Sequence, residues 1–171
     1  TNAAARMREA AAEIGPERVR MLFVETPANP TIELVDIAAV AELARELSGA
    51  CPRRVVTAVD NTFLGPVFQR PTLLGADLVI YSATKFIGGH GDLVAGVVTG
   101  KAELVDAVIL TRSIFGTMAP PFSGWLLLRS LETVSVRMRR QAKNAAVLAY
   151  QLSQHPKVRR VCHPSLLRDG D

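Results

Sequence analysis

The sequence predicts an α/β fold whose sheet is mainly parallel and covered by helices on both faces. Short apolar runs alternate with segments in which apolar residues recur at helical spacing, and this alternation is typical of parallel sheets. With 49% hydrophobic and 21% charged residues, the 171-residue chain has the composition of an ordinary domain with one sizeable core. No apolar run approaches the roughly 20 residues that span a bilayer, so we expect no membrane segment.

In the first half of the chain the boundaries are given by helix breakers and apolar spacing. Gly15 and Pro16 stop an alanine-rich first helix, and apolar residues at helical spacing from Ile37 to Leu47 indicate the second. Gly65 and Pro66 predict a turn after the second strand. The expected elements are a helix over 3–14, a strand over 21–24, a helix over 36–47, a strand over 55–59, a helical turn over 71–74 and a strand over 78–81.

The second half is predicted to be mostly helical. A strand over 93–99 and a helix over 101–111 come first. Residues 122–155 then keep a helical pattern without proline or glycine after Gly124, which is long enough for two helices or one bent helix. Beyond Pro156, residues 158–162 are expected to begin a strand of a second domain. We therefore divide the chain into 1–154 and 155–171.

Charge and cysteine usage exclude several classes of protein. The net charge is +4, but the basic residues between 137 and 143 are spaced as on a solvated helix face, so no nucleic-acid partner is expected. Cys51 and Cys162 lie far apart without a metal-ligand pattern, so we predict no metal site. Two unpaired thiols favour the reducing cytoplasm over a secreted, disulfide-bonded protein.

Three polar motifs stand where predicted strands end. They are Glu-Thr-Pro-Ala-Asn-Pro at 25–30, Val-Asp-Asn-Thr-Phe at 59–63, and Ser-Ala-Thr-Lys at 82–85. Open α/β sheets bind ligands at the carboxyl ends of their strands, so we expect these motifs to share one site. The last motif supplies two hydroxyls for a phosphate and an amine that can attack an aldehyde.

Together these motifs resemble the Cys/Met-metabolism family of pyridoxal phosphate (PLP) enzymes, which includes cystathionine γ-synthase, cystathionine lyases and methionine γ-lyase. The resemblance continues through Gly-His-Gly-Asp at 89–92 and through 121–133 and 136–138, and so covers nearly the whole chain. It implies the large domain of PLP-dependent transferase fold type I, the aspartate aminotransferase-like fold. Residues 1–154 would form part of that PLP-binding domain with a long connecting helix, and 155–171 would begin the C-terminal domain.

The resemblance also implies a role for each polar residue. Lys85 would bond PLP and later move protons on the substrate, and Asp60 would keep the pyridine nitrogen protonated. We expect the Lys85 amine to be partly buried. Ser82 and Thr84 would bind the phosphate, since their two-residue spacing puts both hydroxyls on one side. Asn29 would bond the phenolic oxygen of PLP. Taken alone, these residues are also compatible with a solvated lysine, helix caps and turns.

Two further residues have more limited roles. Glu25 resembles a family glutamate that positions the arginine binding the substrate carboxylate, so Glu25 and Asn29 are the predicted substrate-positioning residues. His90 carries an imidazole, a common catalytic acid or base, but the resemblance makes it a structural residue of the lysine loop, and we do not include it among the catalytic residues. The family tyrosine that stacks on PLP has no counterpart here, and family subunits are longer. We therefore expect a central fragment that binds PLP poorly alone.

The predicted activity is a PLP-dependent carbon–sulfur lyase that performs β- or γ-elimination on a sulfur-containing amino acid. Gly91 followed by Val-Ala-Gly at 94–96 is more similar to methionine γ-lyase than to the synthases. The alternatives are γ-replacement, as in cystathionine γ-synthase or O-succinylhomoserine sulfhydrylase, and a fragment that is inactive in isolation. A serine acylase reading of Ser82-x-x-Lys85 lacks the accompanying Ser-Asp-Asn and Lys-Thr-Gly triplets. A homotetramer, as a dimer of dimers, is expected for the full-length protein.

Overall fold

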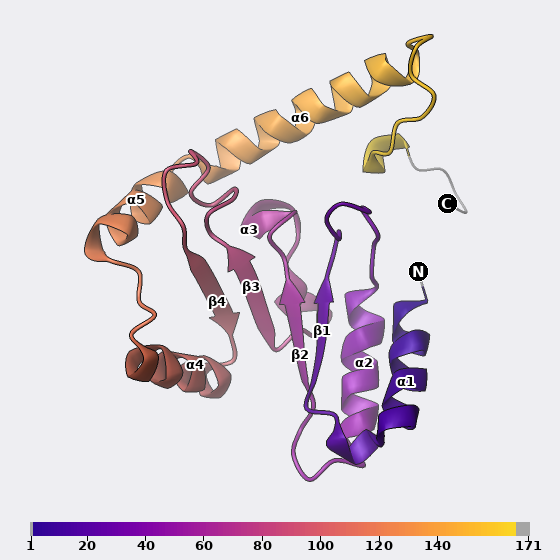
Figure 1. Cartoon of the computed structure of the whole chain (residues 1–171), viewed down its shortest axis with the longest axis vertical. Coiled ribbons are helices and arrows are strands. Elements are labelled where there is room, and N and C mark those ends of the chain that lie inside the picture. Colours follow the sequence, from indigo (N-terminus) through magenta and orange to yellow (C-terminus); the bar gives the residue numbers. More distant parts are fainter. Residues whose placement is uncertain (1, 167–171) are drawn as a thin grey trace.

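The computed structural model describes residues 2–166, which form a four-stranded sheet flanked by helices (Figure 1). The strand order is β1-β2-β3-β4. Strands β1 (Met21–Glu25), β2 (Val56–Asp60) and β3 (Leu78–Ser82) run parallel, and β4 (Gly96–Gly100) pairs antiparallel with β3. The predicted α/β class with a mainly parallel sheet is confirmed.

Helices α1 (Ala3–Ile14) and α2 (Ile37–Ser48) lie side by side, and α2 packs against β1 and β2. Asp36 starts α2, since its Oδ1 accepts a hydrogen bond of 3.0 Å from the Ala39 N–H, which satisfies one of the free donors of the first turn. The core consists of apolar side chains from both helices and from the buried positions of the strands. Its largest fully buried members include Val40, Leu43, Val55, Val59 and Val79.

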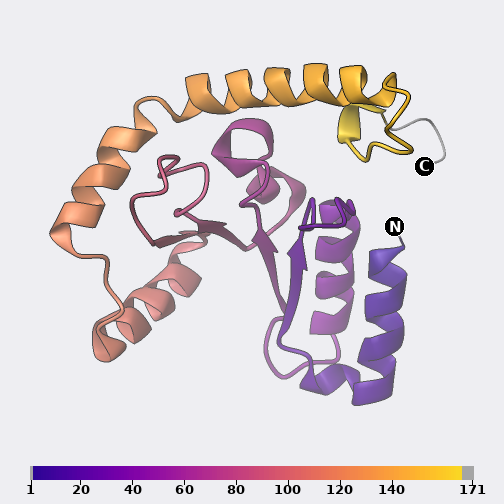
Figure 2. The same cartoon turned by 45° about the horizontal axis from the view of Figure 1, so that its top comes forward.

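The remaining helices follow the course of the chain around the sheet. They are η1 (Pro16–Arg18), α3 (Gly65–Phe68), η2 (Pro71–Leu74), α4 (Ala102–Phe115), α5 (Pro121–Leu131), α6 (Val134–Ser153) and η3 (Pro164–Leu166). Figure 2 shows α6 passing across the end of the sheet toward which β1 and β2 point. The start of α6 therefore lies near the carboxyl ends of the parallel strands.

Most predicted elements are present, with differences at their limits. The helical pattern of 122–155 is broken after Leu131, giving α5 and α6, one of the two expected arrangements. The strand predicted over 93–99 begins only at Gly96, because the Ala95 N–H bonds the Thr84 side chain instead of a backbone carbonyl. The turn predicted at Gly65 contains the short helix α3.

The strand predicted over 158–162 is wrong. These residues have no regular secondary structure and lead into η3. A strand needs a neighbour to satisfy its backbone, and in the described part of the chain nothing pairs with this segment. The proposed second domain at 155–171 extends beyond the described residues, since 167–171 lie outside them.

On β1, only one face is covered by helices, and Met21 and Phe23 on the other face are half exposed.

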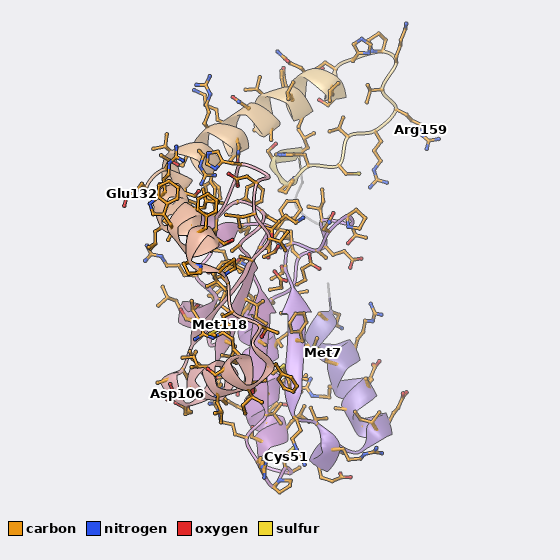
Figure 3. All side chains as sticks on the ribbon, turned by 60° about the vertical axis from the view of Figure 1, so that its left-hand side comes forward. Met7, Cys51, Asp106, Met118, Glu132 and Arg159 are labelled. Atoms are coloured by element: carbon orange, nitrogen blue, oxygen red, sulfur yellow. The ribbon has the colours of Figure 1, made fainter. Side chains whose placement is uncertain are left out.

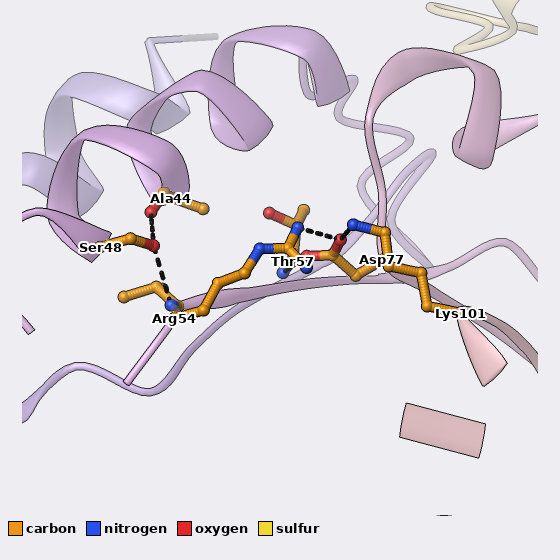
Figure 4. A network of polar contacts seen from close by, with 7 residues as sticks. Ala44, Ser48, Arg54, Thr57, Asp77 and Lys101 are labelled. Carbon is orange, nitrogen blue, oxygen red and sulfur yellow. Dashed lines mark hydrogen bonds and ion pairs between the residues drawn. The ribbon is translucent and has the colours of Figure 1, made fainter. Parts of the chain in front are cut away.

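A charged network lies at the amino ends of the parallel strands, opposite their carboxyl ends (Figure 4). Asp77 is 2% exposed, and its carboxylate accepts hydrogen bonds from Arg54, from Lys101 Nζ at 2.8 Å and from the Thr57 N–H at 2.9 Å. Burial by itself raises the pKa of Asp77, but the hydrogen bonds from Lys101, Thr57 and Arg54 outweigh it, so the pKa lies below its usual value. The network ties β2 and β3 to the end of β4.

Neither free thiol belongs to this network or to a disulfide. Cys51 is half-buried at the end of the molecule opposite Arg159 (Figure 3), and its Sγ donates to the Pro16 carbonyl at 3.0 Å. Cys162 is exposed. Among residues 2–166, none of the helices combines the length and the apolar character that crossing a bilayer requires.

Candidate active site

A cavity of about 560 Å³ opens at the carboxyl ends of the parallel strands. Its size falls within the range of pockets that bind small molecules and cofactors. Residues from β1, β2, β3, the loops that follow them, and α6 contribute to its wall. The lining residues are Glu25, Asn29, Asp60, Thr62, Phe63, Ser82, Lys85, Phe86, Gly89, Gly91 and Gln141.

The strand register brings the three sequence motifs to this cavity. Glu25 is the register partner of Asp60, and both residues end their strands. Asp60 is paired with Ile80, so Ser82 stands two residues further along β3, with its side chain on the same face of the strand as that of Ile80. Five of the six predicted site residues line the cavity, and only Thr84 does not.

Lys85 projects from a tight turn that directly follows β3. Its N–H donates to the Ser82 carbonyl at 3.0 Å, and its own carbonyl accepts from the Gly89 N–H at 2.6 Å. Its amine makes no hydrogen bond or ion pair with the described residues, and the residue is exposed. The expectation of partial burial is therefore wrong for Lys85.

The Asp60 carboxylate is held by Thr62, two residues further along the chain. One oxygen, Oδ1, accepts a hydrogen bond of 2.9 Å from the Thr62 N–H, while Oδ2 has no partner within residues 2–166. The Thr62 hydroxyl in turn accepts a 2.7 Å bond from the Ser82 N–H, which ties the end of β2 to the end of β3. Asp60 thus makes the side-chain-to-backbone bond of a turn aspartate, and its second carboxylate oxygen stays available.

The hydroxyls of Ser82 and Thr84 have different surroundings. Ser82 Oγ makes no hydrogen bond to any described residue, so it is available to an anion at the cavity. Thr84 Oγ1 donates to the Ala95 carbonyl at 3.3 Å and accepts from the Ala95 N–H at 3.0 Å. Ser82 therefore fits the predicted phosphate contact, whereas Thr84 holds the lysine turn against the segment before β4.

Glu25 and Asn29 form one local unit at the mouth of the cavity. The Asn29 N–H donates to Glu25 Oε1 at 3.2 Å, and both residues are exposed. The loop is anchored one residue after Glu25, because the buried Thr26 hydroxyl accepts a 2.9 Å bond from the Val35 N–H. In this structure Glu25 thus fixes the backbone of Asn29, and the arginine predicted as its partner is not among the described residues.

A buried amide network lies beneath the predicted site. Asn61 is 0% exposed, and its Nδ2 donates to the carbonyls of Gly65 at 2.9 Å and Gln69 at 3.1 Å and to the Tyr81 hydroxyl at 3.3 Å. The Gln69 side chain bonds Asn61 Oδ1 at 2.9 Å and the Thr26 carbonyl at 3.1 Å. The network joins the ends of β1, β2 and β3 and so stabilises the floor of the cavity.

Sequence reasoning missed the contribution of α6. Gln141 lines the cavity, and Arg137, one turn earlier, contacts the loop after Lys85 through the carbonyls of Phe86 and Ile87. The resemblance at 136–138 includes Arg137 but implies no role for it, and the helical spacing of four between Arg137 and Gln141 equally fits a solvated face. His90 Nδ1 lies 2.6 Å from the Gly88 carbonyl, in keeping with its expected structural role.

The groups at this cavity fit PLP. An amine without a partner suits the aldehyde, a carboxylate with one available oxygen suits a protonated pyridine nitrogen, and an available hydroxyl suits the phosphate. Lys85, Asp60 and Ser82 supply these three groups: Asp60 and Ser82 end β2 and β3, and Lys85 lies in the turn after β3. Fold and site thus define an α/β cofactor-dependent enzyme site of the PLP type.

The family of this chain follows from its comparison with known proteins. The family model of the Cys/Met metabolism PLP-dependent enzymes matches residues 3–170, and the chain belongs to this family. It is 40% identical over 151 residues to a cystathionine beta-lyase of Coxiella burnetii, covering 87% of this chain and 38% of that protein. It is 41% identical over 162 residues to an L-methionine gamma-lyase of Pseudomonas deceptionensis, covering 94% and 39%.

Both types of activity occur among the similar proteins. A probable cystathionine gamma-synthase of Herpetosiphon aurantiacus is 43% identical over 148 residues, covering 86% of this chain and 44% of that protein. Among solved structures, apo CalE6, a methionine gamma lyase from Micromonospora echinospora, superposes with a TM-score of 0.77 and 38% identity, covering 86% of this chain and 39% of that one. The chain thus spans about two fifths of the length of its relatives.

Proposed function

We propose that this chain carries the PLP-binding lysine of a carbon–sulfur lyase acting on a sulfur-containing amino acid. The observation that supports it is the convergence of the Lys85 amine, the Asp60 carboxylate and the Ser82 hydroxyl on one cavity of about 560 Å³. PLP, when bound, would supply an electron sink that makes the hydrogens of the substrate carbons acidic. The remaining chemistry belongs to residues of the chain.

Each side chain has a defined task in this proposal. Lys85 would hold PLP through its amine and, once free of it, would carry protons between substrate carbons as the carbon–sulfur bond breaks. Asp60 would hold a proton on the ring nitrogen through its available oxygen, and Ser82 Oγ would donate to the phosphate. The Asn29 side-chain amide would bond the phenolic oxygen, while the Asn29 backbone N–H is fixed by Glu25 Oε1.

Elimination is favoured over γ-replacement by the glycine at position 91. Gly91 lines the cavity, and a Cβ built on it would have no heavy atom within 4 Å, so this position leaves the cavity open. The motif from 91 to 96 is more similar to methionine γ-lyase, and two of the proteins described above carry that name. Thiol, ammonia and a 2-oxo acid would be the products.

The first test is to locate the lysine that bonds PLP. The chain is treated with PLP, reduced with borohydride and mapped by peptide mass, with Lys85→Ala as the variant and Lys143→Ala as the matched control, since Lys143 is exposed on α6. We expect pyridoxyl label at Lys85 that disappears only in Lys85→Ala. Equal labelling of Lys85 and Lys143 would refute a cofactor site at Lys85.

The second test separates elimination from replacement. Methionine, cystathionine and O-succinylhomoserine are supplied in turn, the last with and without a thiol, and 2-oxo acid and thioether products are measured. Release of 2-oxo acid from methionine or cystathionine supports the lyase. Turnover of the ester with a thiol alone would assign γ-replacement instead, and labelled but inactive protein would assign an inactive fragment.

We further propose a cytoplasmic location and a homo-oligomer, with PLP and a small amino acid as the ligands. Two free thiols without a disulfide support a reducing compartment. The exposed apolar side chains of α5, Phe122, Trp125 and Leu128, support association with further protein surface. Size-exclusion chromatography with light scattering measures the oligomeric state directly.

A further inference from the structure

Arg137 bridges α6 and the turn that carries Lys85. The residue lies in the first turn of α6 and is half-buried. Its Nη1 donates to the Phe86 carbonyl at 2.9 Å, and its Nη2 donates to the Ile87 carbonyl at 3.2 Å. On the other side, Nη2 donates to the Ser130 carbonyl at 3.0 Å and Nε to the Thr133 hydroxyl at 3.0 Å. The guanidinium thus bonds three backbone carbonyls and one hydroxyl.

The positive charge of Arg137 is balanced by carbonyl dipoles rather than by an acid. Among residues 2–166, no carboxylate forms an ion pair with it. The Ser130 carbonyl belongs to the last turn of α5, where the helix dipole favours a cation. Only a planar guanidinium can reach neighbouring carbonyls and a helix end at once, so lysine is a partial substitute.

Gly89 gives independent evidence that the turn is shaped around this guanidinium. Gly89 has a φ of +75°, and a Cβ built on it would overlap Arg137 Nη1 and lie 2.6 Å from its Cζ. The same residue closes the turn, since its N–H donates to the Lys85 carbonyl at 2.6 Å. The backbone at Gly89 therefore packs directly on the guanidinium.

We propose that Arg137 is a positioning residue that fixes the Lys85 turn, defined as residues 85–89, and thereby directs the Lys85 amine into the cavity. This role rests on the proposed function, because its purpose is to present the amine to PLP. Phe86 and Ile87 lie between the two ends of the turn, so bonding their carbonyls immobilises the segment that follows the lysine. An exposed amine without side-chain partners has only this backbone to orient it.

Amide hydrogen exchange tests the ordering of the turn. In Arg137→Met, which keeps the apolar stem, we expect the Gly89 N–H to exchange about tenfold faster or more, because lost charged hydrogen bonds ease local opening. Arg137→Lys should lie between Met and the unsubstituted chain. The control is Arg139→Met on the same helix, since the Arg139 side chain is exposed and bonds only Ser135 Oγ, at 3.3 Å.

Alanine substitutions at two glycines test the close approach of the Gly89 backbone to the Arg137 guanidinium without changing the arginine. Gly89→Ala and Gly91→Ala share nearly the same backbone cost, with φ of +75° and +71°, but nothing lies within 4 Å of a Cβ at Gly91. We expect Gly89→Ala to reproduce the exchange of Arg137→Met and Gly91→Ala to change it less. Equal effects of the two alanines would overturn the packing argument.

Pyridoxyl labelling links the turn to the amine. The ratio of label at Lys85 to background label at Lys143 should fall about threefold or more in Arg137→Met and recover partly in Arg137→Lys, because a mobile amine is less often aligned with the cavity. A general loss of stability would also lower this ratio, because it removes the cavity while Lys143 stays exposed. Amide exchange at Val59 in the core must therefore stay unchanged for the fall to be assigned to the turn. An unchanged ratio together with unchanged Gly89 exchange would overturn the role.

The two proposals fail in different ways. Absence of label at Lys85 both in the unsubstituted chain and in a full-length version of the protein would overturn the proposed function and, with it, the purpose of the positioning. The exchange measurements would still show whether Arg137 orders the turn. Label at Lys85 with no dependence on Arg137 would retain the proposed function and overturn only the role of Arg137.

Discussion

Replacing Asp77 with asparagine should lower the free energy of unfolding by about 1–2 kcal/mol. The carboxylate bonds two cations, and a charged hydrogen bond is worth about 1.5–3 kcal/mol when buried. The Arg54 and Lys101 side chains are 47% and 45% exposed, so they regain water when the charge is lost, and each contact is worth closer to 0.5–1 kcal/mol, roughly. The amide oxygen of asparagine can still accept from the Thr57 N–H.

Alanine at the same position should cost more. Asp77→Ala leaves the Thr57 N–H without its 2.9 Å partner beside a carboxylate site that is 2% exposed. An unsatisfied buried donor adds about 1–3 kcal/mol, so the total should reach about 3–4 kcal/mol. The free energy of unfolding should therefore be highest with Asp at position 77, lower with Asn and lowest with Ala, as the network geometry requires.

Urea denaturation at neutral and acidic pH is the appropriate assay. Because the folded pKa of Asp77 is lowered, the charged form stabilises the fold above the unfolded pKa of about 3.9. That stability is lost as the pH falls through the folded pKa, so the gap between Asp77 and Asp77→Asn should close at low pH. Asp106→Asn is the control, since Asp106 is exposed on α4 and has no ion pair within the described residues. Equal effects of the two substitutions, or a gap that widens in acid, would refute the reasoning.

Substitutions at three further positions test the fold. Gly100→Ala should destabilise the chain by about 3 kcal/mol, measured in urea, because the φ of Gly100 is +153° and a Cβ there would overlap the Asp77 carbonyl. Asp36→Ala removes the bond to the Ala39 N–H and should cost about 1 kcal/mol in the same assay, whereas Asp36→Asn should retain most of it. Asn61→Leu should cost about 3 kcal/mol or more, since it leaves buried partners unsatisfied, and thermal unfolding should show a clear loss.

The sheet and the strand-end residues could be predicted because their signals are local. Alternating apolar runs located β1, β2 and β3, and parallel strands necessarily bring their carboxyl ends, with Asp60 and Ser82, to one edge. The role of Arg137 could not be predicted in this way. Its partners include the backbone carbonyls of Phe86 and Ile87, about 50 residues away, and a carbonyl carries no sequence signal.

The errors have the same physical origin. The segment 158–162 has apolar residues suited to a strand, but strand formation depends on a neighbouring edge that local sequence does not reveal. The late start of β4 depends on Thr84, whose hydroxyl accepts the Ala95 N–H in place of a backbone carbonyl. In both cases a distant partner decided where the backbone hydrogen bonds go.

The two ends of the parallel strands have different roles. Polar groups at one end stabilise the fold, and polar groups at the other end are available to a ligand. At one end the Asp77 carboxylate has three donors and contributes to the fold. At the other, Lys85 Nζ, Ser82 Oγ and one Asp60 oxygen have no partner among the described residues, although the Asn61 network beneath them is fully bonded. Polar groups that do not satisfy one another contribute little to folding and remain available to a ligand. The bonded backbone of the Lys85 turn, and not contacts between site side chains, therefore sets the geometry of this site.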